Sequence, residues 1–182
     1  MIWPFVVIGL LLIATAIGEW LEGRWWWCGC PRFLGTFQAW SSETSKLFLD
    51  PYSLTHILHG VMFCGLVELI RRRARFARQL LTVMIIECCW ELIENTNAVI
   101  QRYRVATASL GYHGDTIMNS MGDILCCAIG VALAWKLGWR KSIALFVAIE
   151  VLLLFWIKDS LVLEMLMLIH PFSSIKAWQL GH

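Results

Sequence analysis

Charged side chains are scarce in this sequence. Asp, Glu, Lys and Arg make up 15% of its 182 residues, hydrophobic residues make up 59%, and the mean hydropathy is +0.67. An average soluble domain has a charged fraction of about one quarter. The composition therefore argues against an ordinary soluble domain and predicts a membrane protein. Because the chain is short, we expect one transmembrane domain over residues 1–182, with only loops outside the bilayer.

Several functional motifs are missing. The net charge is only +2, and the basic residues flank hydrophobic segments instead of forming one face, which argues against a nucleic-acid partner. The first hydrophobic segment lacks a basic leading region and a small-residue cleavage site, so we expect a retained helix and not a signal peptide. No serine lies in the setting of a nucleophile elbow, which argues against covalent serine catalysis.

Five hydrophobic segments approach the length of about 20 apolar residues that a helix needs to cross a membrane. They lie at 2–21, 54–70, 80–99, 116–137 and 142–163, and a break in the last one is expected near Lys158 and Asp159. The sequence therefore predicts an all-α, polytopic membrane helix bundle of about five transmembrane helices.

Basic clusters at 71–78 and 135–141 predict the orientation of this bundle. Both fall on the same side if there are five spans, and the positive-inside rule makes that side cytoplasmic. The N-terminus is then cytoplasmic, and the Trp-rich loop 24–53 and the loop 101–114 face the periplasm. Two arginines in the second of these loops argue weakly against this orientation.

The loop 24–53 also holds the pair Cys28 and Cys30. An oxidising compartment would permit a disulfide between them or pairing elsewhere. The spacing lacks the second half of a zinc ribbon, which argues against zinc in this loop.

Polar residues occur inside the predicted spans, near their outer ends. They are His56 and His59 in the second segment, Glu87, Glu91 and Glu94 in the third, and Asp115, Asn119 and Asp123 at the fourth. Spacings of three or four residues place each set on one helix face, and alternating span directions place the sets at one depth. Unpaired charges in hydrocarbon cost several kcal/mol each, so we expect the three faces to meet and form a site.

Carboxylate and imidazole groups of this kind bind hard or borderline metals. We therefore expect a divalent ion, either zinc, magnesium, manganese or calcium. Its candidate ligands are His56, His59, Glu94, Asp115 and Asp123, with Glu91 as a further one. Such an ion could polarise an ester or phosphoryl oxygen, with Glu91 or Glu87 as the general base and Asn119 as a further catalytic residue.

Two alternatives to this metal site stay open. The polar set could be a hydrogen-bonded network that joins helices, with some carboxyls protonated, or a path for protons or other solutes. Arg102, Arg104 and Lys158 are candidates for binding an anionic substrate, although such residues also anchor helix ends. A homo-oligomer and a structural subunit of a larger membrane complex are also compatible with the sequence.

Five short runs carry a resemblance to a known family. They read LTHILHG at 54–60, WELIEN at 90–95, RYR at 102–104, GYH at 111–113 and GDTIMNSMGD at 114–123. They resemble a family of small alphaproteobacterial inner-membrane proteins of unknown function, over most of 54–137. This resemblance implies a bacterial inner-membrane location and the fold, but no chemistry.

A more distant similarity is to VanZ-like membrane proteins, through Asp115, Asn119 and Gly122. Those proteins are associated with glycopeptide resistance, which implies a role in the cell envelope. The similarity carries no mechanism with it, but the candidate metal site leads us to expect a metal-dependent hydrolase or transferase acting on a lipid or lipid-linked envelope substrate. The alternative is a non-enzymatic binder or carrier of cations, protons or lipids.

Overall fold

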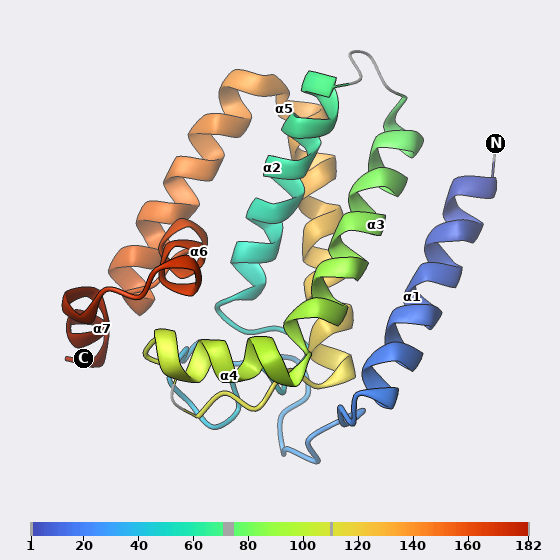
Figure 1. The fold of residues 1–182 in the computed structure, drawn as a ribbon. Helices are drawn as coiled ribbons and strands as arrows, with labels where there is room; N and C mark the ends of the chain where they lie inside the picture. The colour runs from blue at the N-terminus through green and yellow to red at the C-terminus, as the bar shows by residue number, and fades with distance from the viewer. Residues whose placement is uncertain (1, 71–74, 110, 182) are drawn as a thin grey trace.

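The computed structural model describes residues 2–70, 75–109 and 111–181 (Figure 1). In these residues there are seven helices and no strand beyond a single bridge between Gly35 and Leu49. The helices are α1 (Trp3–Leu21), α2 (Ser53–Ile70), α3 (Phe76–Glu94), α4 (Asn97–Ala106), α5 (Ile117–Ile157), α6 (Leu161–Ile169) and α7 (Ser173–Leu180). The predicted all-α class is therefore confirmed.

Helix α5 reverses its direction at Gly138. This residue has φ 72° and ψ 166°, a conformation that glycine adopts far more readily than other residues. Figure 1 shows that the first half of α5 ascends beside α2 and the second half descends on the other side. The Ser142 hydroxyl donates to the Gly138 carbonyl at 2.9 Å and so satisfies one backbone group at the reversal. The two halves correspond to the fourth and fifth predicted segments.

Glycines bring α2 and the first half of α5 into backbone contact. A Cβ added to Gly60 would lie 2.1 Å from the Cys127 carbonyl oxygen, and one added to Gly130 would lie 2.1 Å from the Ile57 carbonyl oxygen. Small residues at such crossings allow close packing between helices in membranes. This contact fixes the lower part of α2 beside the polar residues of α5.

The ends of two segments differ from the prediction. The third segment was expected to reach residue 99, but α3 ends at Glu94 because the Thr96 hydroxyl accepts from the Val99 amide and starts α4. The fifth ends at Ile157, since Lys158 adopts a left-handed conformation with φ 54°. The predicted break near Lys158 is therefore confirmed, and α6 begins after it.

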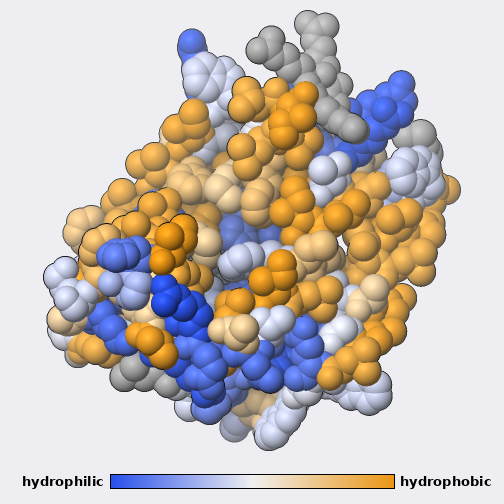
Figure 2. All heavy atoms as spheres, in the orientation of Figure 1, coloured by the Kyte–Doolittle hydropathy of each residue, from blue (hydrophilic) through white to orange (hydrophobic). Residues whose placement is uncertain are grey.

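The surface is apolar over most of the bundle. Helices α1 and α2 are long and apolar enough to cross a membrane, by length and composition. Large hydrophobic side chains stay exposed on α1 and α5, as in Leu10 at 61% and Phe155 at 86%. Figure 2 shows hydrophobic atoms across the middle of the molecule and hydrophilic atoms gathered at the end where α4 lies. These features support a membrane role, while the five-span arrangement stays a prediction.

The ends of the long helices fall at the two ends of the bundle. The start of α1, the end of α2, the start of α3 and the reversal of α5 lie at one end, and α4 lies at the other with the loop between α1 and α2 (Figure 1). Part of the basic cluster used for the orientation, Arg71, Arg72 and Arg73, lies outside the described residues. The side of the membrane on which each end lies stays a prediction.

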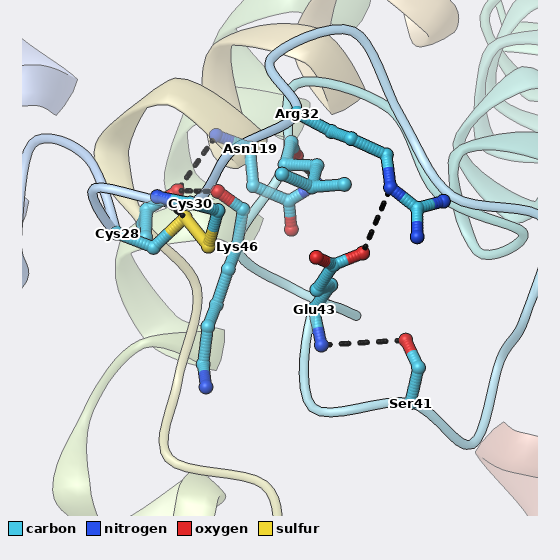
Figure 3. Close-up of a disulfide and its surroundings, with 9 residues drawn as sticks. Cys28, Cys30, Arg32, Ser41, Glu43, Lys46 and Asn119 are labelled. Carbon is cyan, nitrogen blue, oxygen red and sulfur yellow. Dashed lines mark hydrogen bonds and ion pairs between the residues drawn. A yellow bond between two sulfur atoms is a disulfide. The ribbon is translucent and has the colours of Figure 1, made fainter.

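The loop between α1 and α2 is fastened to the start of α5. The amides of Thr116, Ile117 and Met118 donate to the carbonyls of Ser45, Trp25 and Trp26 at 2.9, 2.9 and 3.3 Å. These are amides for which a helix has no internal partners. Nearby, Cys28 and Cys30 form a disulfide, one of the two pairings left open above (Figure 3). The loop is thus part of the folded bundle.

Candidate functional site

The polar sets of three segments converge on one side chain, His56 of α2. Its Nδ1 lies 2.6 Å from Glu87 Oε1 and 3.4 Å from Glu91 Oε1, both on α3. Its Nε2 lies 3.9 Å from Asp123 Oδ2 on α5. All four side chains are buried. The expected meeting of acids and imidazoles from three helices is therefore present at the α4 end of the bundle.

Glu87 is held by two imidazoles. Besides His56, His59 places its Nδ1 3.1 Å from Glu87 Oε2 and 3.2 Å from Oε1. A carboxylate that accepts from the Nδ1 of a histidine fixes the ring and leaves its Nε2 for another partner. Glu87, predicted as a general base, therefore lies where it orients His56, whose Nε2 is directed to Asp123.

Glu91 is a buried carboxylate without a hydrogen bond. Its exposed fraction is 0%, and neither carboxylate oxygen has a hydrogen-bond partner among the described residues. Such a group is costly in a low-dielectric interior unless it is protonated or faces a cation. One candidate ligand set combines Glu91 with His56 and Glu94, and a second combines His56 with His59 and Glu87, each with ligand atoms within 4.8 Å. The nitrogen and oxygen donors of both sets suit a borderline divalent metal.

A second layer of hydrogen bonds joins α3 to the residues just before α5. The Asp115 amide donates to Asn95 Oδ1 at 2.7 Å, and Asn95 Nδ2 donates to Asp115 Oδ2 at 3.2 Å. The Tyr112 hydroxyl also donates to Asp115 Oδ2, at 2.9 Å, and the Tyr103 hydroxyl donates to Glu94 Oε1 at 2.8 Å. Burial raises the pKa of the Asp115 carboxyl, although the bond from Tyr112 opposes this shift.

Asp50 starts α2 and so positions His56. Its carboxylate accepts from the backbone amides of Tyr52 at 2.8 Å and Ser53 at 3.2 Å, which is the role of a helix cap. The Ser53 hydroxyl then donates to Asp123 Oδ1 at 2.7 Å. Burial raises the pKa of Asp50, and its hydrogen bonds from backbone amides counteract this effect.

A cavity of about 530 Å³ opens beside this cluster. Its ionisable lining is mostly acidic and comes from loops as well as helices. The carboxylates that line it are Asp50, Glu94, Asp115, Asp123 and Glu164. His56 also reaches it, and Lys46 is the only Lys or Arg among its described lining residues. A cavity of this size is in the range of small-molecule sites, and its charge favours a cation.

Asn119 also lines the cavity, and its side chain fastens the loop over the site. Asn119 Nδ2 donates to the Leu47 carbonyl at 2.8 Å. Figure 3 shows Asn119 in one view with Lys46, the residue before Leu47, and with the Cys28–Cys30 disulfide of the same loop. The structure thus gives Asn119 a positioning contact, and its predicted catalytic role stays a prediction.

The three cations proposed for substrate binding are engaged elsewhere. Arg102 donates to the carbonyls of Leu168 at 2.7 Å and Ile169 at 3.1 Å, which joins α4 to the end of α6. Arg104 bonds to Tyr112 and His113, and Lys158 donates to the Gly181 carbonyl at 3.1 Å. None of them is among the described residues that line the cavity, so their contacts are those of helix-end anchors. A headgroup role for them stays a prediction.

Several residues of the site were not singled out from the sequence. They are Asp50, Ser53, Asn95, Tyr103, Tyr112 and Glu164. Most of them lie in loops or at helix ends, where helical spacing gives no signal. The runs at 90–95, 102–104 and 111–113, which carried the family resemblance, contain Asn95 and both tyrosines and so offered a clue to three of them.

Comparison with known proteins assigns a family. A family model described as a protein of unknown function (DUF2585) matches residues 20–181. A UPF0314 protein of Brucella anthropi is 39% identical over 98% of this chain and 92% of its own length. UPF0314 proteins of Rhizobium meliloti and Paracoccus denitrificans are 37% and 34% identical, over 99% and 97% of this chain and 91% and 92% of their own lengths.

No solved structure matches this chain significantly. The relatives named above come from alphaproteobacteria, as the resemblance predicted, whereas the more distant similarity to VanZ-like proteins stays a prediction. Since the family model and the relatives each cover most of its length, the chain belongs to the DUF2585 family of proteins of unknown function.

Proposed function

We propose that this chain is a five-span inner-membrane protein that binds a divalent metal ion and acts as a hydrolase or transferase on a lipid-linked substrate. The spans are α1, α2, α3 and the two halves of α5, with the N-terminus in the cytoplasm and the cavity open towards the periplasm. The exposed apolar side chains of these helices support this arrangement. The alternating directions of these helices along the bundle agree with it (Figure 1).

The observation that carries the proposal is the Glu91 carboxylate, which is fully buried without a hydrogen bond beside His56 and Glu94. A divalent ion held by these three side chains would compensate the buried charge. Glu87 and His59 would then keep His56 in place from behind. His59, Asp115 and Asp123 are further candidates for the ligand set, as the sequence predicted.

The cavity is much larger than one ion needs, which supports a substrate site. When bound, a divalent ion supplies Lewis acidity and lowers the pKa of bound water. Asp123 has one oxygen occupied by Ser53 and the other, Oδ2, directed towards His56. It is therefore placed to accept a proton from water or from a substrate hydroxyl. The polar headgroup of the substrate would occupy the cavity between the loops, with its lipid tail outside.

The metal is tested first, by elemental analysis of the purified protein in detergent. We expect about one divalent ion per chain of the wild-type protein. Glu91→Gln should bind the ion at least tenfold more weakly. The matched control is Glu43→Gln, because Glu43 pairs with Arg32 in the loop and does not line the cavity. Equal metal content in both variants, or none in the wild-type protein, would instead support a hydrogen-bonded structural network.

The reaction is tested separately, on membrane lipid extracts and defined ester-linked and phosphate-linked lipids. Asp123→Asn should abolish turnover while the protein still folds and Glu43→Gln remains active. A second function, cation binding or transport without catalysis, is favoured by the excess of carboxylates over cations around the cavity. Ion flux into liposomes that Asp123→Asn alters, together with no turnover of any lipid, would establish that function in place of the enzyme.

A further inference from the structure

A second cavity, of about 700 Å³, lies at the opposite end of the bundle from His56. It is formed by the last turns of α2, the first turns of α3 and the reversal of α5. The side chains that line it are mostly apolar and include Val61, Leu66, Leu69, Trp135, Ile143 and Phe146. None of the residues of the proposed metal site reaches it, so it is a separate feature of the molecule.

Two glycines leave this cavity open. A Cβ added to Gly65 on α2 or to Gly138 at the reversal would have no other atom within 4 Å. Around them, apolar side chains remain exposed, with Leu69 at 71% and Trp139 at 70%. Exposed apolar surface of this kind marks a site that binds a hydrophobic partner. Because its lining residues come from α2, α3 and α5, the hollow lies between helices, where a flexible chain can fit, and it is called the groove below.

The residues that line the cavity have basic neighbours in the sequence, which are called the rim below. Each of these described cations is within four residues of a lining residue, and they are Arg75, Arg78, Lys136, Arg140 and Lys141. The Arg140 guanidinium lies 5.2 Å from the ring centre of Trp139, which is typical of a membrane interface. The lining itself contains one acid, Glu68. The charge of the rim therefore complements an anionic group.

Gln79 adds a specific polar feature to the lining. It is 2% exposed, and its Nε2 donates to the Cys64 carbonyl at 2.8 Å. Its Oε1 has no hydrogen-bond partner among the described residues. The wall of the cavity thus contains one buried acceptor that no described group satisfies.

From these features we infer that the second cavity binds one acyl chain of an anionic glycerophospholipid. The acyl chain fills the groove between α2 and α5, and the phosphate lies among the rim cations. Basic pockets between transmembrane helices bind anionic lipid headgroups in this way. The inference does not depend on a metal or on catalysis at the other end of the bundle.

The experiment is native mass spectrometry of the purified, delipidated protein with phosphatidylglycerol or phosphatidylcholine added. We expect one phosphatidylglycerol per chain, bound at least tenfold more tightly than phosphatidylcholine. Gly65→Phe fills the groove and should abolish this binding. The matched control is Gly9→Phe, since Gly9 on α1 also has open space around it but does not line the cavity. Gly65→Leu serves as a smaller second variant if Gly65→Phe does not fold.

The charge of the rim is tested with Arg140→Gln combined with Lys141→Gln. This variant should lose the preference for phosphatidylglycerol, whereas Arg32→Gln in the loop at the other end should keep it. The inference is overturned if Gly65→Leu and Gly9→Phe bind phosphatidylglycerol alike, or if both lipids bind equally well. It is also overturned if the spectra show a dimer that Gly65→Phe dissociates, because a second copy of the chain would then occupy the groove.

Discussion

The two ring nitrogens of His56 have different carboxylate partners, Glu87 Oε1 at 2.6 Å from Nδ1 and Asp123 Oδ2 at 3.9 Å from Nε2. The first distance is that of a hydrogen bond and the second leaves room for a closer ligand. His56 is therefore fixed from the α3 side and available on the α5 side. The two carboxylates therefore differ in role. Glu87 positions the ring, whereas Asp123 faces the nitrogen that is free to bind a ligand.

The role of Glu87 predicts the effect of Glu87→Gln. The substitution removes the negative charge, and it replaces one carboxylate oxygen, an acceptor beside His56 or His59, with an NH2 group that can only donate. We expect metal affinity to fall about 10- to 100-fold, as is usual when a group behind a ligand is altered. Isothermal titration with zinc and manganese measures it. If the variant binds both metals as tightly as the wild-type protein and has the same circular dichroism spectrum, Glu87 does not support the metal ligands.

The raised pKa of Asp115 predicts how stability depends on pH. Because the folded carboxyl has a higher pKa than the unfolded one, folding takes up a proton. Its contribution to stability is greatest below the unfolded pKa and is lost as pH rises through the folded pKa. The thermal midpoint of the metal-free protein should therefore fall as pH rises above the usual carboxyl range.

Asp115→Asn is the control for this pH dependence, because its amide keeps an acceptor for Tyr112 and does not titrate. Its midpoint should vary less with pH than that of the wild-type protein. A midpoint that rises with pH in the metal-free wild type, or parallel curves for the two proteins, would contradict this account of Asp115.

The close contact between α2 and α5 predicts that Gly130→Leu destabilises the protein strongly. A Cβ at this position would lie 2.1 Å from the Ile57 carbonyl oxygen, so the helices must separate. Overpacking of this kind costs about 1–3 kcal/mol or more. Chemical unfolding in detergent measures the loss against Gly9→Leu, where there is open space. Equal stability of the two variants would mean that the helices are not packed through this glycine.

The bond from Asn119 to Leu47 predicts that Asn119→Ala loosens the loop. Losing a buried hydrogen bond costs about 1 kcal/mol, and the unpaired Leu47 carbonyl adds to this. Hydrogen exchange of the loop amides should become faster while exchange in the middle of α3 stays the same. Unchanged exchange in the loop would show that its other contacts with α5 are sufficient to hold it.

Much of the site could be predicted from the sequence because polar residues are rare in its hydrophobic segments. The spacing of Glu87, Glu91 and Asp123, with alternating span directions, indicated that they would meet near His56. Helical spacing does not reveal partners that come from loops, such as Asp50 and Tyr112. Their positions depend on how the loops fold back over the bundle, and no local pattern encodes that.

The fold, too, could be predicted only in part. Hydrophobic segments located four of the helices and the reversal at Gly138. The shorter helices α4, α6 and α7 were missed because they lack long apolar runs. The start of α4 depends on the Thr96 side chain, a signal that the apolar composition of the surrounding segment obscured.

The carbonyls of Ser45, Trp25 and Trp26 complete the first turn of α5, although they come from a segment that is synthesised some seventy residues or more before it. The first turn of α5 is therefore complete only once the loop between α1 and α2 has folded against it. Until then these amides depend on water, because a helix offers its first amides no internal partner.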